Sequence, residues 1–147
     1  MTTVEHNKAI VRDFIDALFS RGDLSAVERF LSNDFINHDP PVGVSPDRHG
    51  MRSAAEMFRV AFPDWHSVLH QLIGEDDLVV EQFTASGTHR GQFLGAAPTG
   101  SVVFLSGINI FRLRDDAISE RWGRLDELGL LRQLGLIPSV ETAAVRA

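Results

Sequence analysis

The sequence predicts a single α+β domain whose N-terminal helices pack on a strongly curved antiparallel sheet. Apolar residues recur with helical spacing as far as Pro63, and segments typical of strands follow it. The length of 147 residues fits one domain, and no repeat or linker divides residues 1–147. A strongly curved sheet beneath helices forms a cone with an internal apolar cavity, and small ligands bind in cavities of this kind.

The first helix is predicted by an apolar stripe that runs from Val4 to Phe19. Thr2 and Glu5 have the spacing of a capping box at the start of this helix. Gly22 occupies the position that commonly follows a helix end. The chain is therefore expected to begin with one long amphipathic helix.

Two shorter helical patterns follow. Asp23 is a favoured N-cap for a second short helix. Residues 33–44 are polar and rich in proline, which predicts a loop or a short strand. A third helix is expected to have Pro46 at its first position and to stop at Pro63. These helices are expected to cover one face of the sheet.

The period of the apolar residues changes after Pro63. Four segments are predicted as strands: 65–73, 78–89, 101–114 and 117–126. Turn signals rich in glycine and aspartate separate them. Leucines between 128 and 134 predict a short helix that ends at Gly135, and residues 138–147 are expected to form a frayed tail.

Composition and charge exclude several classes of function. The chain has no cysteine, which excludes disulfides, thiolate nucleophiles and cysteine-ligated metals. The formal net charge is −6, and the scattered arginines form no basic cluster for nucleic acid or an anionic membrane. The apolar runs are far shorter than the ~20 residues that span a bilayer, and the N-terminus lacks a secretory signal. We therefore expect a cytoplasmic protein that binds neither nucleic acid nor membrane.

Asp126 is the first candidate for acid/base chemistry. It ends the last predicted strand, at a spacing from Trp122 that places both residues on one face. A carboxylate that Trp122 and apolar neighbours desolvate would have a raised pKa and could act as a general base. Two alternatives remain open, because Asp126 could also cap the following helix or pair with Arg124. Either alternative would lower the pKa that burial raises.

Other polar residues could complete a site. His89 closes a strand, where an imidazole could shuttle protons near neutral pH or simply be solvated. Asn37, His38 and Asp39 precede a diproline, and they could orient a carbonyl at a pocket mouth or stabilise a turn. Asn109 lies in the middle of an apolar strand, where it either lines the pocket or faces solvent.

A metal site is not expected. His66 and His70 are four residues apart, but on a strand this spacing separates them by about 13 Å. The sequence also lacks a glycine-rich phosphate loop, a G-x-S-x-G elbow and an H-E-x-x-H motif. We therefore expect an enzyme or binding protein that uses no metal and no cofactor.

A set of short motifs resembles the SnoaL-like polyketide cyclase family across roughly residues 4 to 137. The motifs in order are Asn37-His38, Phe62-Pro-Asp64, Gly87-Thr-His89, Gly91-x-Phe-x-Gly95, Pro98-Thr-Gly100, Ile110-Phe-Arg112, Glu120-x-Trp122, Asp126 and Gln133-Leu-Gly135. The resemblance implies an α+β cone of the nuclear-transport-factor-2-like superfamily. It also implies ring closure of an aromatic polyketide by intramolecular aldol condensation in antibiotic biosynthesis, without cofactor or metal.

The resemblance also suggests roles for individual residues. Asp126 matches the aspartate that the family uses as general acid/base, and His89 matches a histidine common in the family. Asn109 lies on a strand where cyclases place polar residues, but an asparagine cannot transfer a proton. Other relatives look like hydroxylases of the same pathways.

These observations lead to a working hypothesis. Asp126 removes a proton next to a ketone, and His89, Asn37 or Asn109 donates a hydrogen bond to the developing oxyanion. Aromatic residues are expected to wall the pocket: Phe62, Trp65, Phe93 and Trp122. Two alternatives use the same pocket, namely hydration or epoxide opening by an activated water, and binding of an aromatic metabolite without turnover.

The strand over 101–114 predicts a homodimer. Apolar residues occupy both of its faces, Val103, Leu105 and Phe111 on one and Val102, Phe104 and Ile108 on the other. A sheet that is apolar on both faces buries its second face against a partner. We therefore expect two copies of the chain to pair through the outer face of the sheet.

Overall fold

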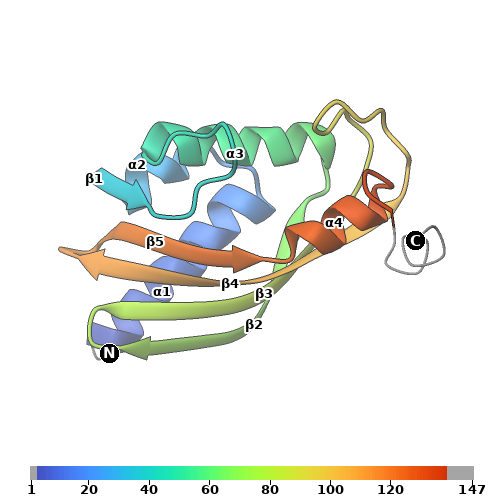
Figure 1. Cartoon of the computed structure of the whole chain (residues 1–147). Coiled ribbons are helices and arrows are strands. Elements are labelled where there is room, and N and C mark those ends of the chain that lie inside the picture. The colour runs from blue at the N-terminus through green and yellow to red at the C-terminus, as the bar shows by residue number, and fades with distance from the viewer. Residues whose placement is uncertain (1–2, 139–147) are drawn as a thin grey trace.

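A computed structural model describes residues 3–138 as helices packed against one curved sheet (Figure 1). The helices are α1 (Thr3–Ile15), the π-helix η1 (Asp16–Ser20), α2 (Ala26–Phe30), α3 (Arg48–Ala61) and α4 (Glu127–Gln133). The strands are β1 (Leu31–Asn37), β2 (His66–Glu75), β3 (Leu78–Thr88), β4 (Val102–Arg114) and β5 (Ala117–Leu125). The predicted α+β class is confirmed, and of the predicted tail 138–147 only Pro138 lies within the described residues.

The sheet is mixed rather than purely antiparallel. Its strand order is β1-β5-β4-β3-β2, and the last four strands in the chain pair antiparallel as predicted. β1 instead pairs parallel with β5, with Asn37 opposite Arg121. The difference arises from β1. This strand takes up the first part of residues 33–44, which were expected to form a loop or a short strand, and it lies beside β5, which is distant in the sequence.

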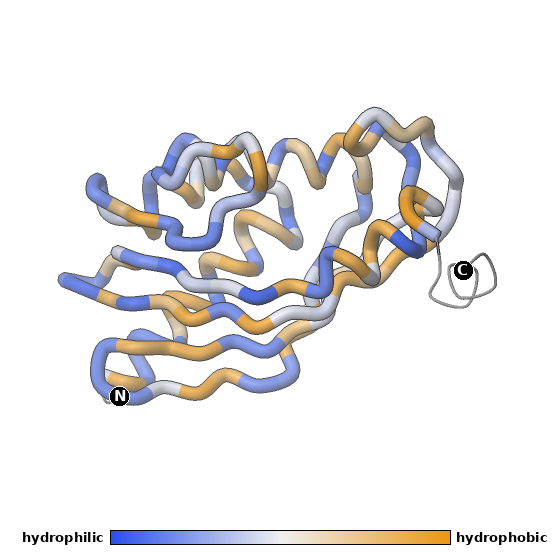
Figure 2. The backbone as a smooth tube through the Cα atoms, in the orientation of Figure 1, coloured by the Kyte–Doolittle hydropathy of each residue, from blue (hydrophilic) through white to orange (hydrophobic). Residues whose placement is uncertain are grey.

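Alternation along the strands separates the two faces of the sheet. Figure 2 shows hydrophobic stretches along β2 and β3 broken by hydrophilic ones, and burial along β3 alternates from one residue to the next, as a sheet with one covered face requires. On β4, Val103, Leu105 and Phe111 are buried, whereas Val102 and Phe104 are exposed. α1 and α3 cover the buried face (Figure 1), and the ring of Phe14 meets that of Phe111 edge-on at 6.1 Å.

Local capping explains where α3 begins. The Asp47 carboxylate accepts a hydrogen bond from the Gly50 backbone N–H at 3.0 Å, so Asp47 is the N-cap. The prediction that Pro46 is the first helical residue is wrong by two positions. The carbonyl of Pro46 instead accepts from the Asn37 N–H at 2.8 Å, which ties the loop before α3 to β1.

The structure adds a break at the end of the first helix that the sequence pattern does not predict. The chain widens there into the π-helix η1, with wider i→i+5 turns. Thr2, half of the predicted capping box, lies outside the described residues. Between residues 3 and 138, no helix has both the length and the apolar character that crossing a membrane requires.

Candidate active site

A cavity of about 90 Å³ lies between the helices and the buried face of the sheet. Its walls are mainly apolar and include Phe14, Phe58, Trp65, Phe83, Leu105 and Phe111. Polar side chains also reach it, namely Asn37, Ser67, Glu81, Asn109 and Arg121. The predicted apolar cavity is therefore present, and it contains a small polar cluster on its sheet side.

Glu81 is the buried acid of this cavity. Strand alternation places it on the same face as Val79 and Phe83, and its side chain is only 1% exposed. Burial raises the pKa of the Glu81 carboxyl to about 7, although the hydrogen bond from Asn109 and the charge of Arg121 oppose the shift. Its Oε1 atom has no hydrogen-bond partner among the described residues. Glu81 therefore combines a pKa near neutrality with a free oxygen at the cavity.

A chain of hydrogen bonds holds the other carboxyl oxygen. Asn109 Nδ2 donates to Glu81 Oε2 at 3.0 Å, and Arg121 Nε donates to Asn109 Oδ1 at 3.0 Å. Because arginine has only donors, the Asn109 oxygen must face Arg121 and its amide nitrogen must face the carboxyl group. Asn109 thus links a buried carboxyl group to a buried guanidinium and fixes the orientation of both.

Arg121 is itself held by β1 and the loop after it. Its Nη1 donates to Asn37 Oδ1 at 3.0 Å and to the Asp39 carbonyl at 2.9 Å. Burial lowers the pKa of Arg121, whereas Asp39 and Glu81 raise it. Gly123 leaves room for this guanidinium, since a Cβ there would clash with Arg121 Nη2. Four elements of the fold therefore meet at one polar cluster.

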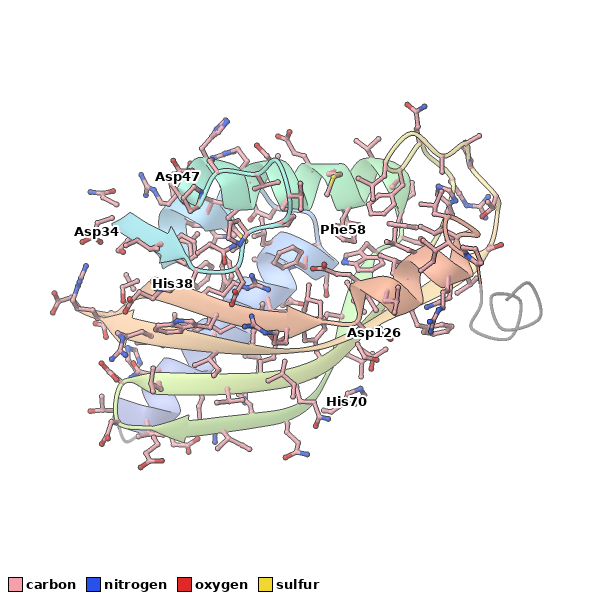
Figure 3. The ribbon with its side chains drawn as sticks, viewed as in Figure 1. Asp34, His38, Asp47, Phe58, His70 and Asp126 are labelled. Atoms are coloured by element: carbon pink, nitrogen blue, oxygen red, sulfur yellow. The ribbon has the colours of Figure 1, made fainter. Side chains whose placement is uncertain are left out.

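Asp126 does not line this cavity. Its side chain is exposed, and Oδ1 accepts from the Gly129 N–H at 2.9 Å, so Asp126 is the N-cap of α4 (Figure 3). The prediction that its carboxylate points into an apolar interior is wrong. The physical reason is that β5 ends at Leu125, and the backbone at Asp126 (φ −79°, ψ 65°) has already left the strand.

His38 and Trp122 lie on the outer face of the sheet. Their rings stack at 4.7 Å with an interplanar angle of 10°, and His38 Nε2 lies 3.1 Å from Glu120 Oε1. The expectation that both line the pocket is therefore wrong. On β5, Trp122 lies opposite Ile110, and the alternation that buries Arg121 turns Trp122 outward.

His89 and Phe93 belong to the loop that joins β3 to β4, and the rings of both pack against Phe62. His89 is completely buried, and its Nδ1 accepts from the Thr99 N–H at 3.2 Å. Its ring centroid lies 5.6 Å from that of Phe62. None of the three lines the cavity. β3 ends at Thr88, so His89 and Phe93 lie beyond the strand, and Phe62 is the C-cap of α3. The expectation that they reach the ligand is therefore not met.

The structure brings together Asn37, Trp65 and Asn109 of the predicted site residues. Glu81 and Arg121 were missed. The sequence carries a signal for Glu81, because this residue falls on the apolar side of the pattern Val79-x-Glu81-x-Phe83. A charged residue at such a position is rarely buried without a partner.

A cone of helices on a curved sheet, with a buried acid in an apolar cavity, defines a class of α+β proteins built to hold a small molecule. The family model of the SnoaL-like polyketide cyclases matches residues 9–134. The chain therefore belongs to the SnoaL-like polyketide cyclase family. Among curated proteins, none matches the sequence.

Solved structures support this assignment. AclR from Streptomyces galilaeus, a candidate hydroxylase, is 28% identical to this chain and superposes with a TM-score of 0.84. The match covers 98% of this chain and 94% of AclR. TsrD from Streptomyces laurentii is 27% identical with a TM-score of 0.82, and the match covers 93% of this chain and 100% of TsrD. IdmH from Streptomyces antibioticus, a candidate polyketide cyclase, is 28% identical with a TM-score of 0.77, and the match covers 88% of this chain and 98% of IdmH.

Proposed function

We propose that this chain is an enzyme that moves protons on a hydrophobic, polyketide-derived carbonyl compound, with Glu81 as its general acid/base. The observation that carries the proposal is the Glu81 carboxyl group, buried in an apolar cavity with a free Oε1 and a pKa of about 7. A base is most effective when its pKa lies near the working pH. Membership of the SnoaL-like polyketide cyclase family supports the substrate class.

The proposed reaction is an aldol-type ring closure. Glu81 Oε1 takes a proton from the carbon next to a carbonyl group, which leaves an enolate and a neutral carboxylic acid. Arg121 and Asn37 supply N–H groups on the side of the cavity where the enolate oxygen gains charge. The enolate carbon then forms a bond with a second carbonyl carbon of the same molecule, and Glu81 returns its proton to the resulting alkoxide.

A second candidate reaction is activation of water by the same carboxylate. The likeness to AclR, a candidate hydroxylase that aligns over 98% of this chain, favours keeping this alternative. Glu81 would then take a proton from water as the water oxygen bonds to an epoxide carbon and the C–O bond of the epoxide breaks. The protonated Glu81 would return its proton to the resulting alkoxide. Both reactions require an ionised Glu81 at the start.

Acetophenone, an aromatic ketone with hydrogens next to its carbonyl group, tests the proposal. In D₂O, we expect the protein to accelerate the exchange of these hydrogens for deuterium, as followed by NMR. The catalysed rate should rise with pH and level off above about pH 7, where Glu81 is ionised. Binding of acetophenone without any exchange above the buffer rate would instead favour a non-catalytic binding protein.

The homodimer also remains a proposal, and the outer face of the sheet supports it. Ile73, Val80, Ile110 and Trp122 lie side by side across four strands in register. Phe104 and Ile108 on the same face are 54% and 47% exposed. An apolar surface of this kind is typical of an interaction site.

Light scattering at micromolar concentration should give twice the mass of one chain. Ile108→Lys should yield a monomer, because it places a charge in the proposed contact. Val42→Lys, at an exposed position between β1 and α3, is the matched control and should remain dimeric. A monomeric wild-type protein would refute the dimer.

A further inference from the structure

A second cavity lies on the other side of Glu81, between the end of α1 and the edge strand β2. Its volume is about 190 Å³. Arg12 and Asp16 line its outer end, where both are exposed to solvent. A cavity of this size can hold several water molecules, since one water needs only roughly 10–15 Å³ of such volume. Its lining combines apolar side chains (Val11, Ile15, Leu69, Leu72) with polar ones (Arg12, Asp16, Ser20, Ser67, Glu81).

The two cavities share a wall. Ile15, Ser67 and Glu81 line both of them. Two buried atoms in this wall, Ser67 Oγ and Glu81 Oε1, have no hydrogen-bond partner among residues 3–138. Leaving such buried atoms unpaired destabilises the fold unless water can reach them. Both unpaired atoms therefore belong to the wall between the two cavities, where water in the second cavity would be their nearest partner.

The helix break next to this wall shapes the second cavity. Ile15 is the last residue of α1, and the π-helix η1 begins at Asp16. π-turns of this kind occur frequently at functional sites. The hydroxyl of Ser20, the last residue of η1, accepts from the Ser67 N–H at 3.0 Å, which ties the helix break to β2. The break thus lies directly on the route from solvent to Glu81.

We infer that the second cavity is a water passage that carries protons between Glu81 and solvent while the first cavity holds the substrate. This inference rests on the proposed acid/base role of Glu81. In the exchange reaction no alkoxide forms to take the proton back. After Glu81 Oε1 removes the proton from a substrate C–H bond, the resulting carboxylic acid therefore passes a proton to the nearest water, and a solvent proton returns to the enolate by the same route. Each water accepts one proton and gives one to the next, so a hydronium ion leaves at Arg12 and Asp16 and the Glu81 carboxylate is restored.

The geometry explains why a separate route is useful. The first cavity is mainly apolar, and a bound substrate excludes water from it. Glu81 is also held from that side by Asn109, whose amide can donate a hydrogen bond but cannot carry a proton onward at neutral pH. The charged groups around Glu81 are Arg121 on β5 and, at the far end of the passage, Arg12 and Asp16.

The test measures deuteration of the Glu81 carboxyl group after mixing into D₂O. The protonated carboxyl group has an infrared carbonyl band, which is assigned to Glu81 because Glu81→Gln lacks it. The band is recorded below about pH 7, where Glu81 is protonated. Leu72→Phe fills the second cavity, Ala54→Leu fills the first, and Val68→Phe on the outer face of β2 is the matched control. Denaturant unfolding checks that each variant is folded.

We expect Leu72→Phe to slow deuteration by at least about tenfold, because exchange then depends on local opening of the fold. Ala54→Leu and Val68→Phe should leave the rate unchanged. If Leu72→Phe does not fold, Leu69→Phe fills the same cavity. Equal slowing by Ala54→Leu, or no slowing by a folded variant at Leu72 or Leu69, would overturn the passage.

This readout does not depend on turnover. Failure of acetophenone exchange together with slowed deuteration in Leu72→Phe would refute the proposed function and leave the passage standing. Catalysed acetophenone exchange together with an unchanged deuteration rate in Leu72→Phe would refute the passage and leave the proposed function standing.

Discussion

Replacing Glu81 with glutamine is expected to lower the catalysed exchange of acetophenone hydrogens by about 10²–10⁴-fold, the usual contribution of a positioned acid/base group. The substitution preserves the shape of the side chain, and the glutamine oxygen can still accept the hydrogen bond that Asn109 Nδ2 gives to Glu81 Oε2. Binding of acetophenone, followed by the fluorescence of the cavity residue Trp65, should therefore change little. A loss of rate without a loss of binding identifies a group that acts in the transition state.

Asp126→Asn is the control that separates the two candidate bases. Asparagine caps a helix about as well as aspartate, so the variant should keep the N-cap of α4. It removes the charge, and we expect a rate close to that of the wild-type protein. Full activity of Glu81→Gln, combined with an inactive but folded Asp126→Asn, would return the acid/base role to the residue that the sequence motifs indicated.

The second large effect concerns stability. The pKa of Glu81 is about 7 in the folded protein against an ordinary value of 4.5. Between these values the folded state binds more protons than the unfolded state, so the free energy of unfolding falls as pH rises. The wild-type protein should thereby lose about 3 kcal/mol across pH 4.5 to 7, relative to a variant without this carboxyl group. Above pH 7 the difference should stay constant.

Denaturant titrations of wild type and Glu81→Gln across this interval measure the effect. The free energy of unfolding of the wild type should fall relative to that of Glu81→Gln as pH rises, because only the wild-type protein must ionise a buried acid. Glu56→Gln makes the same chemical change at an exposed position of α3. Its free energy of unfolding should depend on pH in the same way as that of the wild type. Parallel curves for Glu81→Gln would mean that Glu81 titrates normally and would remove the main support for its role as base.

These two predictions describe one trade-off. An acid that is buried in an apolar cavity destabilises the fold when it ionises, and the same burial brings its pKa close to neutral pH. The hydrogen bonds through Asn109 to Arg121 limit this cost by stabilising the charged form. Active sites commonly give up stability in this way.

Asp126 and Glu81 show where the sequence argument succeeded and where it failed. The cap and the buried base were both open interpretations for Asp126, and local motifs favoured the base. The choice depends on whether the strand continues through Asp126, and the structure ends β5 one residue earlier. Alternation alone would have placed Glu81 on the buried face with Val79 and Phe83, since that pattern lies entirely within one regular strand.

The sequence by itself determined the α+β class, the strands β2 to β5 and the faces of β4, because apolar periodicity is a local property that the backbone geometry imposes. Only the tertiary structure decided which polar residues meet. The bonds of the cluster join residues 28, 12 and 84 positions apart, on β3, β4, β5 and β1. Such contacts depend on strand pairing and register between distant segments, and no local pattern of residues specifies them.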